Sequence, residues 1–241
     1  MVIFMEVTRS VYYRNLLSWF REFAKLRVKP AIIFDQTTAT VKTVVNRIML
    51  MIKNGDLVNK KIVFIGDDDF MSICSALTSL PKKIAVIDID SRITTRIENI
   101  LENLYTPFKV YQQDLREELP LSILKKYDTF FTDPSYTIEC VELFTLRGFE
   151  CLRENGKGYV CIPSEDYSVE LTKSIIRNLN RLGVNILSMW KNFNRYIKSK
   201  NCNNIMPRRF KSSLIRVESA GVKKPCKHFT EKIYAYKSYK K

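Results

Sequence analysis

The pattern of hydrophobic positions changes about sixty residues into the chain. Before that point, the segments 10–26 and 41–53 place their large apolar side chains at helical spacing, and Asn54-Gly55 ends the second segment. This spacing predicts two amphipathic helices. From Lys61 onwards, short apolar runs alternate with longer stretches of helical spacing. Such alternation is typical of a parallel sheet that is covered by helices.

Seven short apolar runs are the candidate strands. They cover 62–65, 84–87, 108–111, 129–132, 158–162, 184–189 and 214–217, and the helical stretches among them cover 71–80, 93–104, 138–152 and 169–182. We therefore predict an α/β fold in which about seven strands form one sheet with helices on both faces. We divide the chain into an N-terminal helical segment at 1–30, an α/β domain at 31–217 and a tail at 218–241. The segment 198–209 is expected to be a loop.

The composition favours a folded protein of the reducing cytoplasm. Hydrophobic residues make up 46% of the 241 residues, and no apolar run approaches the roughly 18 residues that span a bilayer. Six cysteines include no C-x-x-C pair, and the single histidine, His228, stands two residues after Cys226. This spacing is poor for zinc, so we expect no metal site. We expect Cys140, Cys151 and Cys161 to be buried free thiols, although disulfides stay open for a hyperthermophilic source.

The net charge of +15 is distributed unevenly. Residues 1–30 carry +4 and residues 191–241 carry +13, whereas residues 31–190 carry −2. A basic tail is usually a solvated surface, but it also suits contact with RNA or another polyanion. The alternation of apolar and polar residues at 232–239 is typical of an ordinary strand. The charge therefore leaves RNA contact open, while the middle of the chain is mildly acidic.

Acidic residues follow four successive predicted strands. They are Gly66-Asp67-Asp68-Asp69 after the first, Asp88 and Asp90 after the second, Asp114 after the third and Asp133 after the fourth. A single aspartate at such a place is commonly a helix N-cap, as we expect for Asp90 and Asp128. The carboxyl ends of parallel strands, however, meet at one edge of a sheet, where ligands bind. Four successive acidic ends therefore predict a ligand site.

The spacing of these residues favours an adenosine-containing ligand without phosphate. Asp88 follows Gly66 by 22 residues, close to the spacing at which a carboxylate takes ribose hydroxyls. The first turn has one glycine and three aspartates, which disfavours the phosphates of NAD and ATP. S-adenosylmethionine suits the turn better. Its carboxylate would still meet repulsion of about 4 kcal/mol per charge at 4 Å, so decarboxylated S-adenosylmethionine is the preferred donor.

Several segments together resemble one family, the N4-bis(aminopropyl)spermidine synthases, which are the branched-chain polyamine synthases of archaea and bacteria. The segments are Phe34-Asp35-Gln36, Gly55-Asp56-Leu57, Gly66-Asp67-Asp68-Asp69, the run from Leu80 to Asp90, Asp114-Leu115, Asp128-Thr129-Phe130, Thr132-Asp133-Pro134, and Asn192-Phe193-Asn194 with Tyr196. The likeness covers residues 20 to 217. We expect the chain to lack the winged-helix extension that longer members carry ahead of the catalytic domain.

The resemblance implies a class I methyltransferase-like (Rossmann-like) sheet and an aminopropyltransferase. Such an enzyme moves aminopropyl groups from decarboxylated S-adenosylmethionine to a polyamine nitrogen and releases methylthioadenosine. It further implies that residues 31–217 are the catalytic domain and makes a homodimer plausible. The implied catalytic residues are Asp68 and Asp133, and the implied cofactor-binding residues are Gly66, Asp67, Asp69, Asp88 and Asp114. On the acceptor side we expect Asp35, Tyr136, Glu139, Asn192 and Asn194.

Two other functions remain open. Where the family has Pro-Glu-Thr after Asp133-Pro134, this chain has Ser135-Tyr136-Thr137. The resulting Asp-Pro-Ser-Tyr is similar to the D-P-P-Y turn of amino-methyltransferases, whose aromatic ring stacks on a planar amine. Together with the basic ends, this supports an S-adenosylmethionine-dependent methyltransferase acting on a base nitrogen of RNA or another nucleic acid. The third hypothesis is a non-catalytic member of the fold that binds nucleosides or RNA.

Overall fold

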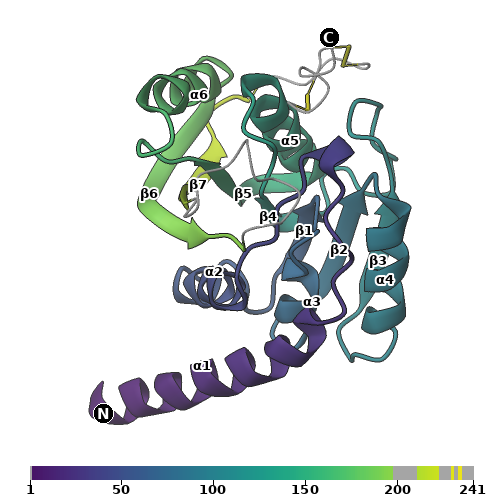
Figure 1. Cartoon of the computed structure of the whole chain (residues 1–241), viewed down its shortest axis with the longest axis vertical. Helices are drawn as coiled ribbons and strands as arrows, with labels where there is room; N and C mark the ends of the chain where they lie inside the picture. The colour runs from purple at the N-terminus through teal and green to yellow at the C-terminus, as the bar shows by residue number, and fades with distance from the viewer. Residues whose placement is uncertain (1, 198–210, 223–228, 231–232, 235–241) are drawn as a thin grey trace.

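A seven-stranded sheet runs through the centre of the computed structural model (Figure 1). The structure describes residues 2–197, 211–222, 229–230 and 233–234, with the backbone alone at 2–9. The strands are β1 (Lys61–Ile65), β2 (Lys83–Asp88), β3 (Phe108–Gln112), β4 (Tyr127–Thr132), β5 (Leu152–Pro163), β6 (Val184–Arg195) and β7 (Lys211–Ser219). Their order across the sheet is β3-β2-β1-β4-β5-β7-β6. The predicted count of about seven strands is confirmed.

One strand runs against the others. The pairs among β1, β2, β3, β4 and β5 are parallel, whereas β7 pairs antiparallel with both β5 and β6. The sheet is therefore mixed rather than fully parallel. The alternation of strands and helices ends before this pair, because β6 and β7 follow each other without a described helix between them. Consecutive strands pair antiparallel without the crossover that a parallel pair needs.

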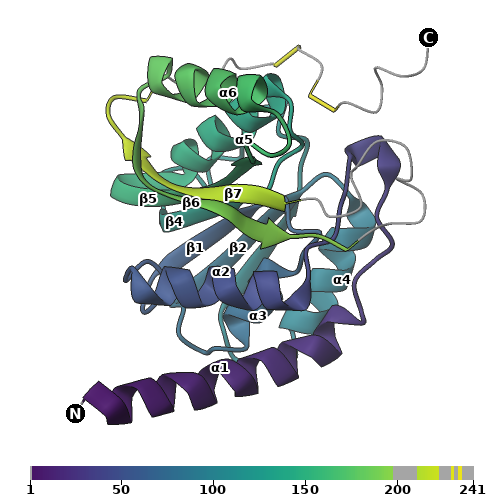
Figure 2. The same cartoon turned by 60° about the vertical axis from the view of Figure 1, so that its left-hand side comes forward.

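Helices cover both faces of the sheet, as predicted (Figure 2). One face carries α1 (Val2–Ala24), α2 (Val41–Lys53), α3 (Met71–Ala76) and α4 (Ser91–Leu101), and the other carries α5 (Ile138–Cys151) and α6 (Val169–Arg181). Alternate strand residues supply the two cores: Phe64 and Val86 face the first set of helices, whereas Val63 and Ile65 face the second. A short 3-10 turn, η1 (Ile32–Phe34), precedes α2.

Helix ends differ from the sequence pattern at three places, of which α4 (Ser91–Leu101 against the predicted 93–104) is one. The stretch predicted as a helix over 71–80 ends at Ala76, because the chain turns at Thr78 and Ser79 has a positive φ of 55°. The hydroxyl of Thr78 donates to the carbonyl of Ser75 over 2.6 Å, which closes that turn. The first helix begins at Val2, earlier than the predicted start at residue 10. No helix among the described residues is long and apolar enough to cross a membrane.

Parts of the predicted tail pack against the body. Ile233 is 2% exposed, and its carbonyl accepts a hydrogen bond from the Thr137 hydroxyl over 2.9 Å. The backbone N–H of Phe229 donates to the carbonyl of Arg116 over 2.9 Å. The predicted loop at 198–209 and most of the predicted strand at 232–239 lie outside the described residues. The domain boundaries at 30 and 217 stay predictions.

The cysteines agree with the sequence analysis where the structure describes them. Cys140, Cys151 and Cys161, and also Cys74, are buried free thiols. Burial raises the pKa of each of these thiols, so they are unreactive at neutral pH. All four lie in the two cores, and the Cys161 sulfur also accepts Arg47 and Asn194 over 3.4 Å each.

Candidate active site

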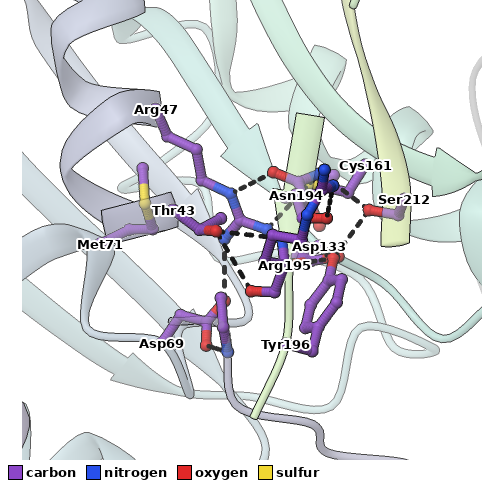
Figure 3. Close-up of polar contacts among 12 residues, drawn as sticks. Thr43, Arg47, Asp69, Met71, Asp133, Cys161, Asn194, Arg195, Tyr196 and Ser212 are labelled. Atoms are coloured by element: carbon purple, nitrogen blue, oxygen red, sulfur yellow. Dashed lines mark hydrogen bonds and ion pairs between the residues drawn. The ribbon is translucent and has the colours of Figure 1, made fainter. Parts of the chain in front are cut away.

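The carboxyl ends of β1 and β4 meet around one buried arginine of α2 (Figure 3). Arg47 is 0% exposed. Its guanidinium donates to Oδ2 of Asp69 over 2.8 Å and to Oδ2 of Asp133 over 2.5 Å. Its Nε donates to Oδ1 of Asn194 over 2.9 Å. We call Arg47, Asp69, Asp133, Asn194 and Tyr196 the Arg47 cluster.

The turn after β1 depends on the glycine at its start. Gly66 has a φ of +69°, which side chains rarely adopt, and a Cβ there would lie 3.3 Å from the Phe144 ring. Asp67 follows and accepts the backbone N–H groups of Met71 and Ser72 over 2.6 and 3.0 Å. Burial raises the pKa of Asp67 to about 8. The side chain of Asp67 thus anchors the first turn of α3.

Asp68 differs from its two neighbours. Among the described residues its carboxylate makes no hydrogen bond or ion pair, and it is only partly covered, whereas Asp67 and Asp69 are each 2% exposed. The loss of water around it raises its pKa well above the ordinary aspartate value. The negative charges of nearby carboxylates raise it further, and these belong to Asp69, Asp133, Asp88 and Asp67. Asp68 is therefore an accessible carboxylate suited to accept a proton.

Asp69 is held inside the protein. Besides Arg47, its carboxylate accepts the backbone N–H of Ala39 over 2.5 Å, and its carbonyl accepts Arg27 over 2.5 Å. These bonds connect the β1 turn with the segment before α2. Asp69 therefore holds the β1 turn in place against the segment before α2.

Two tyrosines complete the surroundings of Asp133. The hydroxyl of Tyr196 lies 2.9 and 3.0 Å from its two carboxylate oxygens, and the hydroxyl of Tyr136 lies 3.2 Å from Oδ1. The two hydroxyls are 2.8 Å apart. Burial raises the pKa of Asp133, while Arg47 acts in the opposite direction. The carboxylate side chain is 12% exposed, so part of it faces outwards.

The end of β2 carries a second carboxylate site. Asp88 is 7% exposed and accepts the backbone N–H groups of Asp67 and Asp90 over 2.9 Å each. Burial raises its pKa to about 6. Asp90 begins α4 as its N-cap, as predicted, and pairs with Arg92 over 2.6 Å. Asp88 thus adjoins the β1 turn through its bond to Asp67.

Asp114 lies at the end of β3, beside the predicted tail. It pairs with Arg116 over 2.5 Å. The ring of Tyr234 packs edge-on against Phe34, with ring centres 5.8 Å apart. Burial raises the pKa of Tyr234 well above its usual value, and the charges of Asp88 and Asp114 add to this effect. Tyr234 was not singled out from the sequence, and its place near the ends of β2 and β3 is a result of tertiary structure.

The remaining predicted acceptor-side residues lie in different surroundings. Asp35 accepts the hydroxyl of Ser135 over 2.7 Å, so it adjoins the segment after Asp133. Glu139 lies in the first turn of α5 and is partly exposed. The expectation that these residues contact an acceptor stays a prediction.

The two asparagines of β6 have different partners. Asn194 is fully buried, and its amide is divided between Arg47 and the hydroxyl of Ser212, to which it donates over 2.7 Å. Asn192 instead donates to Asp166 over 3.1 Å and has a φ of 53° within an irregular part of the β6–β7 pairing. The structure thus brings Asn194 into the Arg47 cluster and attaches Asn192 to the β5–α6 connection. Roles for both as substrate-binding residues stay predictions.

The sequence analysis did not single out Arg47. A signal was available, because Arg47 occupies the apolar face of the predicted helix, three residues after Val44 and four before Met51. A buried charge on such a face needs partners of opposite charge. No group of three or more potential ligands that could hold a metal ion occurs among the described residues.

Comparison with known proteins gives this site a family. Residues 15–240 match the family model of the branched-chain polyamine synthase A C-terminal domain. The N(4)-bis(aminopropyl)spermidine synthase of Thermococcus kodakarensis is 40% identical over 188 residues, which are 77% of this chain and 54% of that protein. The chain therefore spans about half the length of the curated relatives it matches.

Solved structures agree with this comparison. The branched-chain polyamine synthase from Thermus thermophilus, in complex with N4-aminopropylspermidine and 5'-methylthioadenosine, has a TM-score of 0.82 at 27% identity and covers 92% of this chain and 68% of its own. An S-adenosylmethionine-dependent methyltransferase from Clostridium acetobutylicum has a TM-score of 0.57 at 12% identity, covering 84% and 99% respectively, which shows the fold alone. The sheet is class I methyltransferase-like, as predicted, and the chain belongs to the branched-chain polyamine synthase A C-terminal domain family.

Proposed function

We propose that the chain is an aminopropyltransferase that moves aminopropyl groups from decarboxylated S-adenosylmethionine to a polyamine nitrogen and releases methylthioadenosine. The observation that carries this proposal is Asp68, an accessible carboxylate among buried carboxylates at the ends of β1, β2 and β4. The 40% identity to a bis(aminopropyl)spermidine synthase supports the reaction, and the complex of the Thermus thermophilus enzyme supports the substrate classes.

Asp68 would act as the general base. A secondary amine of a polyamine is an ammonium at neutral pH, so it must lose a proton before its nitrogen can attack. The carboxylate of Asp68 accepts that proton, and its raised pKa makes it a better acceptor than an ordinary aspartate. The proton later passes to solvent. Asp133, with its partly exposed carboxylate, would orient the ammonium from the end of β4.

The transfer itself is a displacement at carbon. The nitrogen lone pair forms a bond to the aminopropyl carbon next to sulfur, and the carbon–sulfur bond breaks with its electron pair going to sulfur. The sulfonium thereby becomes the neutral thioether of methylthioadenosine, and the positive charge moves to the acceptor. In this proposal Asp88 holds the ribose, Asp114 meets the adenine edge, and Gly66 with Asp67 and Asp69 forms the turn beside the donor.

The acceptor would be held by a second group of residues. Asp35, Tyr136, Glu139, Asn192 and Asn194 are its candidates from the sequence. The hydroxyl of Tyr136 donates to Oδ1 of Asp133, so a polyamine that contacts Tyr136 would also contact that carboxylate. Contact of the basic tail with RNA and assembly as a homodimer are further parts of the proposal.

One incubation tests the function directly. The protein is mixed with decarboxylated S-adenosylmethionine and a panel of linear polyamines, and products are read by mass spectrometry for added aminopropyl units. We expect methylthioadenosine and an aminopropylated amine. A parallel incubation with S-adenosylmethionine and RNA tests the methyltransferase hypothesis. Methylated RNA without aminopropyl transfer would replace our proposal by that hypothesis.

A further inference from the structure

Arg47 is a permanent cation enclosed among carboxylates. Its side chain is 0% exposed, and its guanidinium lies over the ring of Phe131, with 5.1 Å from Cζ to the ring centre. The three N–H directions meet acceptors on three different segments: Asp69 after β1, Asp133 after β4 and Asn194 in β6. Because a guanidinium is a planar fork, these bonds fix the directions of the two carboxylates relative to each other.

Arg47 cannot itself touch a substrate, because no part of its side chain is exposed. Asp133 is different, since 12% of its side chain is exposed while its Oδ2 is held by Arg47 at 2.5 Å. An effect of Arg47 on the reaction must therefore pass through its bonded neighbours, of which the two carboxylates pair with its charge. Two bonds attach α2 to the end of β6: the Thr43 hydroxyl donates to the carbonyl of Arg195, and Arg47 donates to the hydroxyl of Tyr196 (Figure 3).

We propose that Arg47 is a positioning residue of the aminopropyl transfer: it orients Asp133 and lowers the negative charge that Asp68 experiences. This inference rests on the proposed function. A residue of α2 would thereby set the direction of Asp133, after β4, and the charge around Asp68, after β1.

The charges around the cluster determine the sign of the effect. The titratable and charged groups that face it from the surrounding elements are Arg27, Asp67, Asp68, Asp69, Asp88, Asp133, Tyr136, Cys161 and Tyr196. Arg47 is the cation that pairs directly with Asp69 and Asp133. Removing it leaves these carboxylates with like charges nearby, which raises their pKa values and, through coupling, the apparent pKa of the cluster. More of the base is then protonated at a given pH.

Two variants separate charge from geometry. Arg47→Met removes the positive charge. We therefore expect the acid limb of the profile of kcat/KM against pH to shift to higher pH by about one unit or more. The decrease in kcat/KM relative to the wild type should be about tenfold or more near neutral pH and smaller at high pH. Arg47→Lys keeps the charge but cannot reach three acceptors, so we expect an acid limb near that of the wild type with a lower kcat.

Arg216→Met is the matched control. Arg216 pairs with Asp56 over 2.7 and 3.0 Å ahead of β1, at the opposite end of the strands. Its loss should lower stability without moving the pH profile. Each profile is measured by mass spectrometry of the aminopropylated product, with folding checked by circular dichroism at each pH.

The outcomes decide between the two proposals. A wild type that transfers no aminopropyl group overturns the proposed function and this inference with it. A wild type that transfers, with an Arg47→Met profile that only scales down by a constant factor, overturns this inference alone. If Arg47→Met does not fold, Arg47→Lys decides: unchanged kcat overturns the positioning role, and reduced kcat at an unchanged acid limb supports it.

Discussion

At the scale of single residues, the acidic side chains at the strand ends differ by their partners. Asp67 accepts two backbone N–H groups of α3, and Asp69 is paired with Arg47. Asp68 has no hydrogen bond or ion pair in the part of the chain that the structure describes. Three consecutive residues of one type therefore have three different surroundings. Among the described residues, the partly exposed Asp68 is the one of the three whose side chain holds no other segment in place.

The first prediction concerns this free carboxylate. Asp68→Asn should lower turnover by roughly 10²–10⁴-fold, because the amide cannot accept the proton. The midpoint of thermal unfolding should stay the same or rise, because no described hydrogen bond is lost and the repulsion from nearby carboxylates is removed. Asp69→Asn is the comparison, and it should lower the free energy of unfolding by about 3–5 kcal/mol, because it leaves Arg47 buried without one partner. An Asp68→Asn protein that retains wild-type turnover would remove this residue from the mechanism.

The pH dependence of the reaction gives a second prediction. Asp68 must be deprotonated to act, and its pKa lies well above the ordinary aspartate value. Activity should therefore fall as pH decreases through that raised pKa, well before ordinary aspartates are protonated. A profile of kcat/KM against pH for the wild type measures this limb. A limb at the pKa of an ordinary aspartate would contradict the enclosure of Asp68 by like charges.

At the scale of secondary structure elements, side-chain caps fix where the helices begin. Thr40, Asp90, Thr137 and Ser168 each accept a backbone N–H in the first turn of α2, α4, α5 and α6. Thr137 has a second bond, because its hydroxyl donates to the carbonyl of Ile233. The start of α5 is thus attached to the far end of the chain, close to Asp133.

The third prediction separates these two bonds of Thr137. Thr137→Ala should lower the free energy of unfolding by about 1 kcal/mol and also increase hydrogen exchange around Ile233. Ser168→Ala removes the equivalent cap of α6, which accepts Leu171 over 3.2 Å and has no bond to the described residues of the tail. It should cost a similar free energy and leave exchange at Ile233 unchanged. Equal exchange at Ile233 in both variants would show that the hydroxyl does not anchor this segment.

At the scale of the whole molecule, the distribution of charge bears on which donor the proposed site would bind. The molecule carries +15, but the ends of β1, β2 and β4 gather five aspartates against one buried arginine. Arg47 reduces the negative charge that the sequence suggested without removing it. Asp88, with a pKa of about 6, is ionised at neutral pH, while Asp67, with a pKa of about 8, is mostly protonated.

The fourth prediction follows from these charges. Calorimetry should show decarboxylated S-adenosylmethionine binding at least tenfold more tightly than S-adenosylmethionine, whose extra carboxylate is repelled. The affinity for the doubly cationic donor should rise as pH increases through about 6 and about 8, because Asp88 and Asp67 then ionise. Neutral methylthioadenosine should respond much less to pH. Tighter binding of S-adenosylmethionine would contradict the charge argument and favour a methyltransferase.

The sequence by itself determined the layers of the fold and the acidic edge of the sheet. Hydrophobic spacing is a local property, so it predicted about seven strands, the two helical faces and the positions of Asp67 to Asp69, Asp88, Asp114 and Asp133 after their strands. The motifs also predicted the family, because their residues, such as Gly66-Asp67-Asp68-Asp69, resemble its sequence pattern. What a local pattern could not give is pairing between distant segments, such as the antiparallel direction of β7.

Only the tertiary structure decided which of the acidic residues are free. Arg47 and Asp133 are 86 residues apart, and Tyr234 reaches Phe34 across almost the whole chain. Such contacts depend on how helices and strands pack, and packing decides which charges lose water and which find a counterion. Residue type and spacing therefore located the carboxylates, whereas burial among particular neighbours separated the partly exposed Asp68 from the enclosed Asp69.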